Sequence, residues 1–311
     1  MLLFTRTLQG PAGHSSASAR SYDSIKLLVK KVYIDSTIAG LGITNCNYWF
    51  NAFSNCTEVR GFENLSDMAS ANQMFSSCTS LETIYATSFS NSGLSGSLMF
   101  TGCTRLVGGT DGFVPSQTSG ASVCKLGAGG VLTDPNNDAR TWFWARYYAD
   151  GEGVLTAAST PDATRELVAS GHICAIGKYV GLGFTPWDGM TGPTHRQYLT
   201  SATFASDMAT FSYLNLNYLF YSCTNLTSVS GLGNLSGVRS MRYTFSGCSH
   251  MTTIYADATW ALPSSGITGS QCFYSCRALV GGNGTAWSSS NVGYTYMRID
   301  RAGQTGYLTA A

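Results

Sequence analysis

Charged side chains are scarce in this sequence, because Asp, Glu, Lys and Arg make up only 11% of its 311 residues, against about 25% in an average soluble domain. The 18 basic residues almost balance the 17 acidic ones, which leaves a formal net charge of +1. A chain so close to neutral lacks the basic surface that attracts a polyanion, so we expect no nucleic-acid partner. Ser, Thr, Asn, Gly and Tyr must cover the surface in place of ion pairs.

Long apolar runs are missing as well. No stretch approaches the about 20 apolar residues that cross a bilayer, so we expect no membrane insertion. The start, MLLFTRTLQGPAG, has neither a continuous apolar core nor a convincing cleavage site, and no signal peptide is visible in it. Hydrophobic residues still make up 44% of the chain. That is enough for one large domain or two ordinary ones, each with a sizeable core.

Signatures of catalysis and of metal or cofactor binding are absent from the sequence. No P-loop, G-x-S-x-G, H-E-x-x-H or calcium-loop spacing occurs. The nearest paired acids, Asp150 and Glu152, are expected in a solvated turn. His172 and Cys174 would act as a nucleophile pair only with a third group to orient them. We therefore expect no enzyme, no cofactor and no metal site.

What the sequence does contain is a repeat. The stretch FSSCTSLETIYA at 75–86 returns as FSGCSHMTTIYA at 245–256, and six copies of Phe-x-x-Cys-x-x-apolar occur in two sets of three. The Cys-to-Cys steps are 22 and 25, then 25 and 28 residues, and the second set repeats the first at offsets of 167, 170 and 173. These steps are typical of leucine-rich repeats. The repeated residues are Phe53, Cys56, Phe75, Cys78, Phe100, Cys103, Phe220, Cys223, Phe245, Cys248, Phe273 and Cys276.

The residues around each Cys predict a short helix followed by a short strand. Stepping back from Cys78 by 3 and 7 residues meets Phe75 and Ala71, which is the spacing of a helix face. Downstream, Ile84 and Ala86 alternate as in a strand. Stacked copies would form a parallel strand ladder that buries each unit only against its neighbours. We therefore expect an α/β fold, a leucine-rich-repeat-like solenoid of two tandem arrays of helix–strand coils.

The Cys of each phrase is expected on the inward stripe of its helical turn, as a small side chain packed against the next coil. Equivalent residues of stacked helices lie about 10 Å apart, which exceeds the about 7 Å that a disulfide spans between Cα atoms. The repeated cysteines should therefore be free, buried thiols. Cys272 takes the slot held by Met74 and Met99, so we expect it in the core together with Cys276.

Each array ends in a similar tail, which predicts a β-rich cap. LVGG at 106–109 matches 279–282, and GVLTAA at 153–158 matches GYLTAA at 306–311. A cap is needed because a terminal repeat would otherwise expose its apolar end. The Gly- and Pro-rich stretch after the first cap reads as a connection with one strand around 172–176. The predicted organisation is an N-terminal arm (1–23), a first lobe with its cap (24–158), a linker (159–195) and a second lobe with its cap (196–311).

An aromatic segment, TWFWARYY, lies inside the first predicted cap. Alternation along a strand would place Trp142 and Trp144 on one face and Phe143 on the other. Exposed flat rings stack on sugars or anchor a protein partner, so Trp142, Trp144 and Tyr147 are the candidate ligand-binding residues. The alternative is that this cluster only seals the end of the array or the junction between the lobes.

The phrases MFSSCTSL at 74–81 and MFTGCTRL at 99–106 resemble the BspA-type leucine-rich repeat family of bacterial surface proteins, whose repeats read M-F-x-x-C-x-x-L-x-x-L-x-L. LVGGNGTAW and RIDRAGQTGYLT, within 279–309, also resemble the ends of such arrays, so that the resemblance covers about two thirds of the chain. It implies an α/β solenoid that serves recognition or attachment outside the cell, with a protein or glycan on a cell surface as partner.

Members of this family normally carry a signal peptide and a wall anchor, and neither is visible here. Display on a phage virion is therefore nearly as well supported as display on a bacterial cell surface. The competing expectation is a structural virion or appendage component that works mainly by self-assembly, and a homo-oligomer stays open under both readings.

Overall fold

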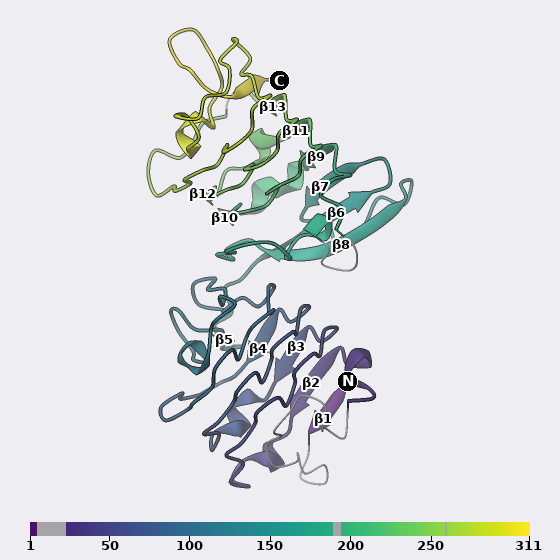
Figure 1. Cartoon of the computed structure of the whole chain (residues 1–311), viewed down its shortest axis with the longest axis vertical. Coiled ribbons are helices and arrows are strands. Elements are labelled where there is room, and N and C mark those ends of the chain that lie inside the picture. The colour runs from purple at the N-terminus through teal and green to yellow at the C-terminus, as the bar shows by residue number, and fades with distance from the viewer. Residues whose placement is uncertain (5–22, 189–193, 259) are drawn as a thin grey trace. The chain divides into compact units, whose positions relative to one another are not determined.

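The computed structural model describes residues 1–4, 23–188, 194–258 and 260–311 (Figure 1). The chain divides into two compact units, Met1–Arg140 and Thr141–Ala311. Within the described residues, strands and turns are joined by short 3-10 helices, and none of the segments is an α-helix. No helix in these parts of the chain is long and apolar enough to cross a membrane. The fold is thus a mixed one, made of sheets with very little helix.

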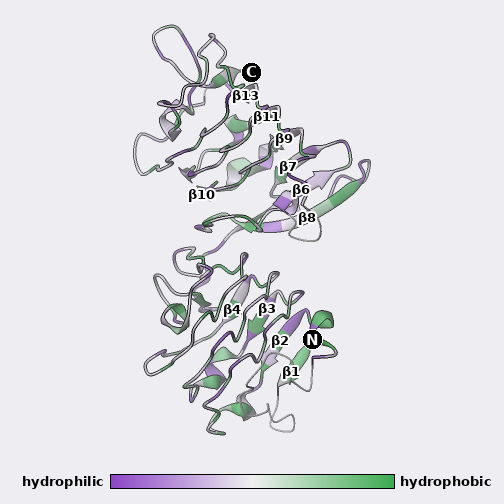
Figure 2. Cartoon of the chain, in the orientation of Figure 1, coloured by the Kyte–Doolittle hydropathy of each residue, from purple (hydrophilic) through white to green (hydrophobic). Residues whose placement is uncertain are grey.

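The first unit contains one parallel sheet of five short strands, which follow one another in chain order. Its strands are β1 (Leu2–Phe4), β2 (Lys31–Ile34), β3 (Glu58–Arg60), β4 (Thr83–Tyr85) and β5 (Leu132–Thr133), and its 3-10 helices are η1 (Lys26–Leu28), η2 (Ser36–Ile38), η3 (Phe62–Leu65) and η4 (Ala121–Val123). Val32 pairs with Val59, Val59 with Ile84, and Ile84 with Leu132. All four side chains are buried. Burial alternates along β2, where Lys31 is exposed and Val32 and Ile34 are buried, and Figure 2 shows both hydrophilic and hydrophobic colours in the sheet of the first unit.

The second unit contains a sheet of seven strands in the order β14-β13-β11-β9-β7-β6-β8, and a separate pair, β10-β12. The strands are β6 (Trp142–Tyr148), β7 (Glu152–Thr156), β8 (Leu167–Cys174), β9 (Ser201–Phe204), β10 (Leu214–Asn215), β11 (Ser228–Ser230), β12 (Val238–Ser240), β13 (Thr253–Ala256) and β14 (Leu308–Ala310). The 3-10 helices are η5 (Pro186–Asp188), η6 (Ser206–Thr210), η7 (Leu232–Asn234) and η8 (Tyr294–Tyr296). Strand β6 pairs antiparallel with both β7 and β8, whereas the other neighbours in the large sheet are parallel.

The five parallel strands of the second unit repeat the five of the first. Val59 pairs with Ile84, and Val229 pairs with Ile254, each 170 residues later. Strand β14 follows β13 as β5 follows β4, so GYLT at 306–309 is equivalent to GVLT at 130–133. The predicted match of GYLTAA to GVLTAA at 153–158 is wrong, because the latter stretch forms β7 and pairs with β9.

The predicted boundary between the lobes is therefore corrected. Strands β6 and β7 fall in the second unit, and the predicted linker at 159–195 holds β8, which pairs with β6. The same stretch contributes the fully buried Trp187, whose ring stacks on Phe220 with centroids 5.4 Å apart. A strand around 172–176 is expected from the sequence, and β8 begins five residues earlier and ends at Cys174, before the Gly- and Pro-rich residues.

Each unit is built around a column of stacked phenylalanines, which we call the Phe ladder. In the first unit the ring centroids of Phe50 and Phe75 lie 5.3 Å apart, and those of Phe75 and Phe100 lie 5.8 Å apart. In the second unit the corresponding distances are 5.5 Å and 5.9 Å. None of the six side chains is more than 1% exposed. The ladder of the second unit consists of Phe220, Phe245 and Phe273.

The first predicted copy of the repeat is out of register by three residues. The pairing of Val59 with Ile84 aligns Phe50, not Phe53, with Phe75. Phe53 therefore occupies the slot that Cys78 fills one coil later. The stretch FNAFSNC matches the repeat pattern in two frames, and only the strand register distinguishes them.

The predicted helical turn before each Cys is also wrong. Gln73 and Ser77 have positive φ angles of 50° and 64°, which an α-helix does not allow. The amide of Phe75 donates to Met99 O at 3.0 Å and that of Ser77 to Thr101 O at 2.7 Å. These donors bind the next coil rather than their own, so each phrase is an irregular turn tied to its neighbour.

The repeated cysteine links successive coils through its thiol. The Sγ atom of Cys78 donates to Phe50 O at 3.0 Å, and that of Cys248 donates to Phe220 O at 3.1 Å. Cys103 and Cys276 make the same bond to the ladder residue of the coil before. All ten cysteines are free and buried. Burial raises the pKa of Cys248 well above its usual range and that of Cys276 to about 12, because a thiolate would lose its hydration.

We expect these thiols to be chemically inert in the native chain. At pH 8 a disulfide-exchange reagent such as Ellman's reagent should find almost no reactive thiol within minutes, because the thiolate is the nucleophile and burial suppresses it. After unfolding in guanidinium chloride all ten should react. Prompt reaction of even one equivalent per native chain would show that a cysteine is accessible and would contradict the ladder's geometry.

We expect the Phe ladder to dominate the stability of each unit. Phe75→Ala and Phe245→Ala should each lower the free energy of unfolding by about 3–5 kcal/mol, because a buried ring is replaced by a cavity. Tyr255→Ala is the matched control, since this ring is 40% exposed and should cost no more than about 0.5 kcal/mol. Urea unfolding followed by circular dichroism measures all three. Equal losses for the ladder and control variants would be inconsistent with the account.

Candidate functional site

The outward side of the β6–β8 pair carries the sequence-predicted tryptophans. Trp142, Trp144 and Arg146 alternate along β6, and Trp144 pairs with His172 of β8. The ring centroids of Trp144 and His172 lie 3.7 Å apart, and those of Trp142 and His172 lie 6.2 Å apart. The guanidinium carbon of Arg146 lies 5.4 Å from the centroid of the Trp144 ring. These four residues form one surface, which we call the aromatic face.

Arg146 is held in place rather than free to move. Its side chain is only 3% exposed, and Nη2 donates to Ala158 O at 2.6 Å. The carboxylate of Asp207, in η6, accepts from Thr156 Oγ1 at 2.6 Å and from the Ala158 amide at 3.0 Å. Burial alone would raise the pKa of Asp207, but these hydrogen bonds and the charge of Arg146 lower it. A fixed cation therefore lies beside the Trp144 ring.

Tyr147 does not belong to the aromatic face. It points to the opposite side of β6 together with Phe143, is 5% exposed, and stacks on His195 with centroids 5.0 Å apart. Phe143 packs edge-on against Phe211 at 5.8 Å. The inward side of β6 thus seals the core, as the alternative reading of the cluster expects, while the outward side keeps Trp142 and Trp144 half-buried. Sequence reasoning grouped Tyr147 with the tryptophans although strand alternation already separates them.

The acidic pair that the sequence places in a solvated turn is tied to one arginine. Arg165 contacts Asp150 at 2.6 Å and Glu152 at 2.8 Å between nitrogen and oxygen. The same guanidinium lies 4.0 Å from the centroid of the Tyr148 ring. These carboxylates therefore close the turn between β6 and β7.

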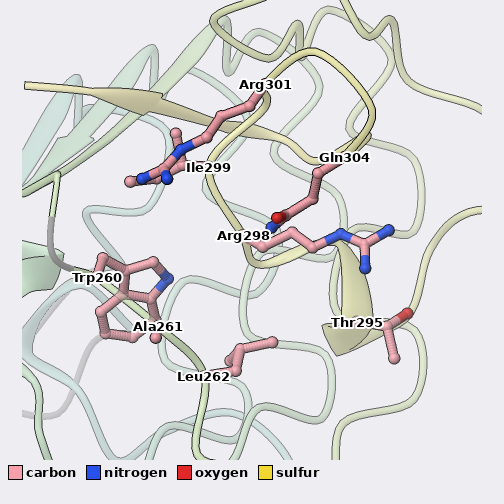
Figure 3. A pocket seen from close by; sticks show the side chains of 8 residues that line it. All are labelled: Trp260, Ala261, Leu262, Thr295, Arg298, Ile299, Arg301 and Gln304. Carbon is pink, nitrogen blue, oxygen red and sulfur yellow. The ribbon is translucent and has the colours of Figure 1, made fainter.

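A pocket of about 410 Å³ lies near the end of the chain (Figure 3). Figure 3 shows Arg301, Gln304 and Arg298 along one side, and Trp260 and Leu262 along the other. Three of the side chains that line the pocket also tie a loop to a backbone carbonyl. Arg301 Nη2 donates to Ala258 O at 2.9 Å, Arg298 Nε to Thr305 O at 2.6 Å, and Trp260 Nε1 to Met297 O at 3.0 Å. Two fixed guanidinium groups beside an indole suit a small anion, but the same contacts suffice to hold the loops closed.

Comparisons with protein-family models and with curated protein sequences find no match. Among solved structures, the chain is similar to a leucine rich cell surface protein from Faecalibacterium prausnitzii A2-165, at 12% sequence identity and a TM-score of 0.22. The match covers 89% of this chain and 86% of that one. At this identity and TM-score, it establishes neither a fold nor a function for the present chain.

One buried carboxyl group makes the second unit sensitive to pH. Asp188, in η5 beside the ladder-covering Trp187, has a side chain that is 1% exposed and lies 3.3 Å from Arg196 Nε. Burial raises its pKa to about 6, although the charge of Arg196 acts in the opposite direction. The native state therefore holds this proton between about pH 4 and 6, where the unfolded chain has released it.

We expect the contribution of Asp188 to stability to be largest at low pH and to be lost as the pH rises through 6. Carboxylates with a lowered pKa, such as Asp207 and Asp300, make the native state less stable as the pH falls, which is the opposite effect. The wild type must therefore be compared with Asp188→Asn at each pH. The free energy of unfolding of the variant, minus that of the wild type, should be lower at pH 4 than at pH 7 by up to about 3 kcal/mol. Chemical unfolding at several pH values measures this difference. A difference that does not change with pH would contradict the raised pKa.

Proposed function

We propose that the chain is a non-enzymatic recognition or attachment protein, built as two tandem solenoids, that binds a protein or glycan on a cell surface. The observation that best supports this proposal is the aromatic face. The second unit repeats the five parallel strands of the first and adds β6 and β8 to them. These two additional strands carry Trp142, Trp144, Arg146 and His172. The proposed location of the protein is outside the cell, on a bacterial surface or a phage virion.

The chemistry of the aromatic face suits binding. Indole rings offer flat apolar area that stacks on the C–H face of a sugar or fills a pocket of a protein partner. Trp is among the side chains most enriched where binding energy concentrates, and Trp142 and Trp144 are the partly exposed residues of β6. Both rings contact His172 of β8, with centroids 6.2 Å and 3.7 Å away, and these contacts hold the rings before a ligand arrives. Little side-chain entropy is then lost on binding.

The rest of the outward side of this sheet carries a row of hydroxyls beside one carboxylate, Glu152, which accepts from Thr203 Oγ1 and is paired with Arg165. Strand β9 places Ser201 and Thr203 there, and β11 adds Ser228 and Ser230. Thr203 Oγ1 lies 3.0 Å from Ser230 Oγ, so the hydroxyls form rows across the strands. Such rows donate and accept hydrogen bonds as sugar hydroxyls do, which supports a glycan as the partner.

The second candidate function is that of a structural component that assembles with itself. Strand β8 is an edge of the seven-stranded sheet. Its Leu167 and Val168 are 38% and 43% exposed. An uncovered edge strand with apolar side chains can pair with an edge of another chain. This observation favours self-assembly specifically through β8.

The test is attachment of the fluorescently labelled full chain to whole bacteria and to immobilised host matrix proteins. We expect retention at micromolar concentration, and at least about tenfold weaker retention for Trp142→Ala/Trp144→Ala, because removing one central anchor typically costs 2 kcal/mol or more. The matched control is Tyr198→Ala/Tyr274→Ala, which removes two exposed rings elsewhere in the second unit. Circular dichroism verifies that each variant is folded.

The outcomes separate the two functions. Binding that the tryptophan variant loses and the control keeps supports recognition through the aromatic face. Equal binding by both variants rejects this face as the site. If neither surface retains the chain, and sedimentation shows oligomers that Leu167→Lys/Val168→Lys dissolves, self-assembly replaces recognition as the function.

A further inference from the structure

A second surface of the second unit forms a groove of about 420 Å³. It runs over the short ladder made by β10 and β12, which an isolated parallel bridge from Ser240 to Thr268 extends by one row. The segment 178–180 lines one side of it. Tyr179 anchors that segment, since its ring stacks on Phe184 at 4.0 Å and its hydroxyl accepts from the Cys174 amide at 3.0 Å.

The floor of the groove is a row of oriented polar groups. Asn217 Oδ1 accepts from Ser240 Oγ at 2.6 Å and from the Arg242 amide at 2.8 Å. Ser240 Oγ in turn lies 3.1 Å from Thr268 Oγ1. Successive rows of a parallel ladder are about 4.8 Å apart. The groove therefore presents hydroxyl and amide groups at a regular spacing and in fixed orientations.

The charged side chains that line the groove are all basic. They are Lys178, Arg239 and Arg242, and no Asp or Glu is among the lining residues. Arg239 Nη1 donates to Val238 O at 3.0 Å, and the Arg242 guanidinium lies 5.2 Å from the centroid of the Tyr243 ring. Within the described parts of the chain, neither arginine forms an ion pair. In a chain with a net charge of only +1, this is a local excess of positive charge.

The first unit shows that this charge is not needed to build the ladder. There, Asn47 Oδ1 accepts from Ser70 Oγ at 2.8 Å and from the Asn72 amide at 2.6 Å, the same bonds that Asn217 makes 170 residues later. The backbone and its polar row are thus common to both units. At the positions of Arg239, Arg242, Tyr243 and Tyr213 the first unit has Ala69, Asn72, Gln73 and Ile43.

We propose that this groove binds an anionic saccharide, namely a sugar that carries a carboxylate. Arginine binds a carboxylate through paired N–H groups that match its two oxygens. Tyr213, 38% exposed at the groove, offers a ring for the face of the sugar. The row of Asn217, Ser240 and Thr268 pairs with sugar hydroxyls. The volume lies within the range of small-ligand pockets, and the site does not depend on the aromatic face.

The test titrates the full chain by calorimetry with oligosaccharides of a hexuronic acid and with their carboxyl-reduced, neutral counterparts. The wild type should bind the acidic form at least tenfold more tightly than the neutral form, and raising the salt concentration should weaken only the acidic form. Arg239→Ala/Arg242→Asn installs the residues of the first unit, which the same ladder accommodates, and should weaken acidic binding at least tenfold. Lys30→Ala/Arg277→Ala removes the same charge at two exposed positions outside the groove and should leave it unchanged.

Equal affinity for the acidic and neutral sugars, or equal affinity of the groove variant and the wild type, overturns the proposal. Binding of inorganic phosphate or a nucleotide with no binding of uronic acids also overturns it. The Trp142→Ala/Trp144→Ala variant separates this site from the proposed attachment function. It should bind the acidic sugar as the wild type does, even if it no longer attaches to cells.

Discussion

The stacking of one buried phenylalanine per coil is the constraint on which the rest of the structure depends. Each ring lies between 5.3 Å and 5.9 Å from the next within its unit. The Cys of the following coil adds a thiol hydrogen bond to the carbonyl of the ladder residue. Because a coil of about 25 residues cannot bury these rings alone, it is stable only against its neighbours. Ring, thiol and turn amides together fix the spacing and register of every coil.

That register brings side chains from distant coils into rows, and the rows form the surfaces that can bind a ligand. The outward rows of the large sheet carry hydroxyls and end at the aromatic face. The short ladder carries the Asn and Ser groups that floor the groove. Comparison of the two units shows which residues build the ladder and which vary on it. Asn47 and Asn217 make the same bonds in the two units, whereas Asn72 of the first unit is replaced by Arg242 in the second. A residue that changes on an unchanged scaffold is free to serve binding.

The sequence predicts the repeated phrase, the strand that follows four of the six repeated cysteines and the shared face of Trp142 and Trp144, since these rest on strict spacing. Within the residues that the structure describes, no strand directly follows Cys103 or Cys276. The sequence does not predict the turns, because apolar residues three and four apart fit successive turns closed between residues i and i+3 as well as a helix. The bonds from Cys78 N to Phe75 O and from Leu81 N to Cys78 O are of this kind. Nor does it predict the frame of the first copy or the partner of GVLTAA, which only long-range strand pairing decides. His172 joins the site through β8, whose pairing with β6 leaves no local signal.

The most direct measurement is amide hydrogen exchange across the native chain. The account predicts that the turns containing Phe75 and Ser77 exchange as slowly as strands β3 and β4, because their amides bind the next coil. The equivalent turns of the second unit should behave in the same way. Fast exchange in these turns beside slow exchange in the strands would contradict it, since the coils would then be joined through the sheet alone.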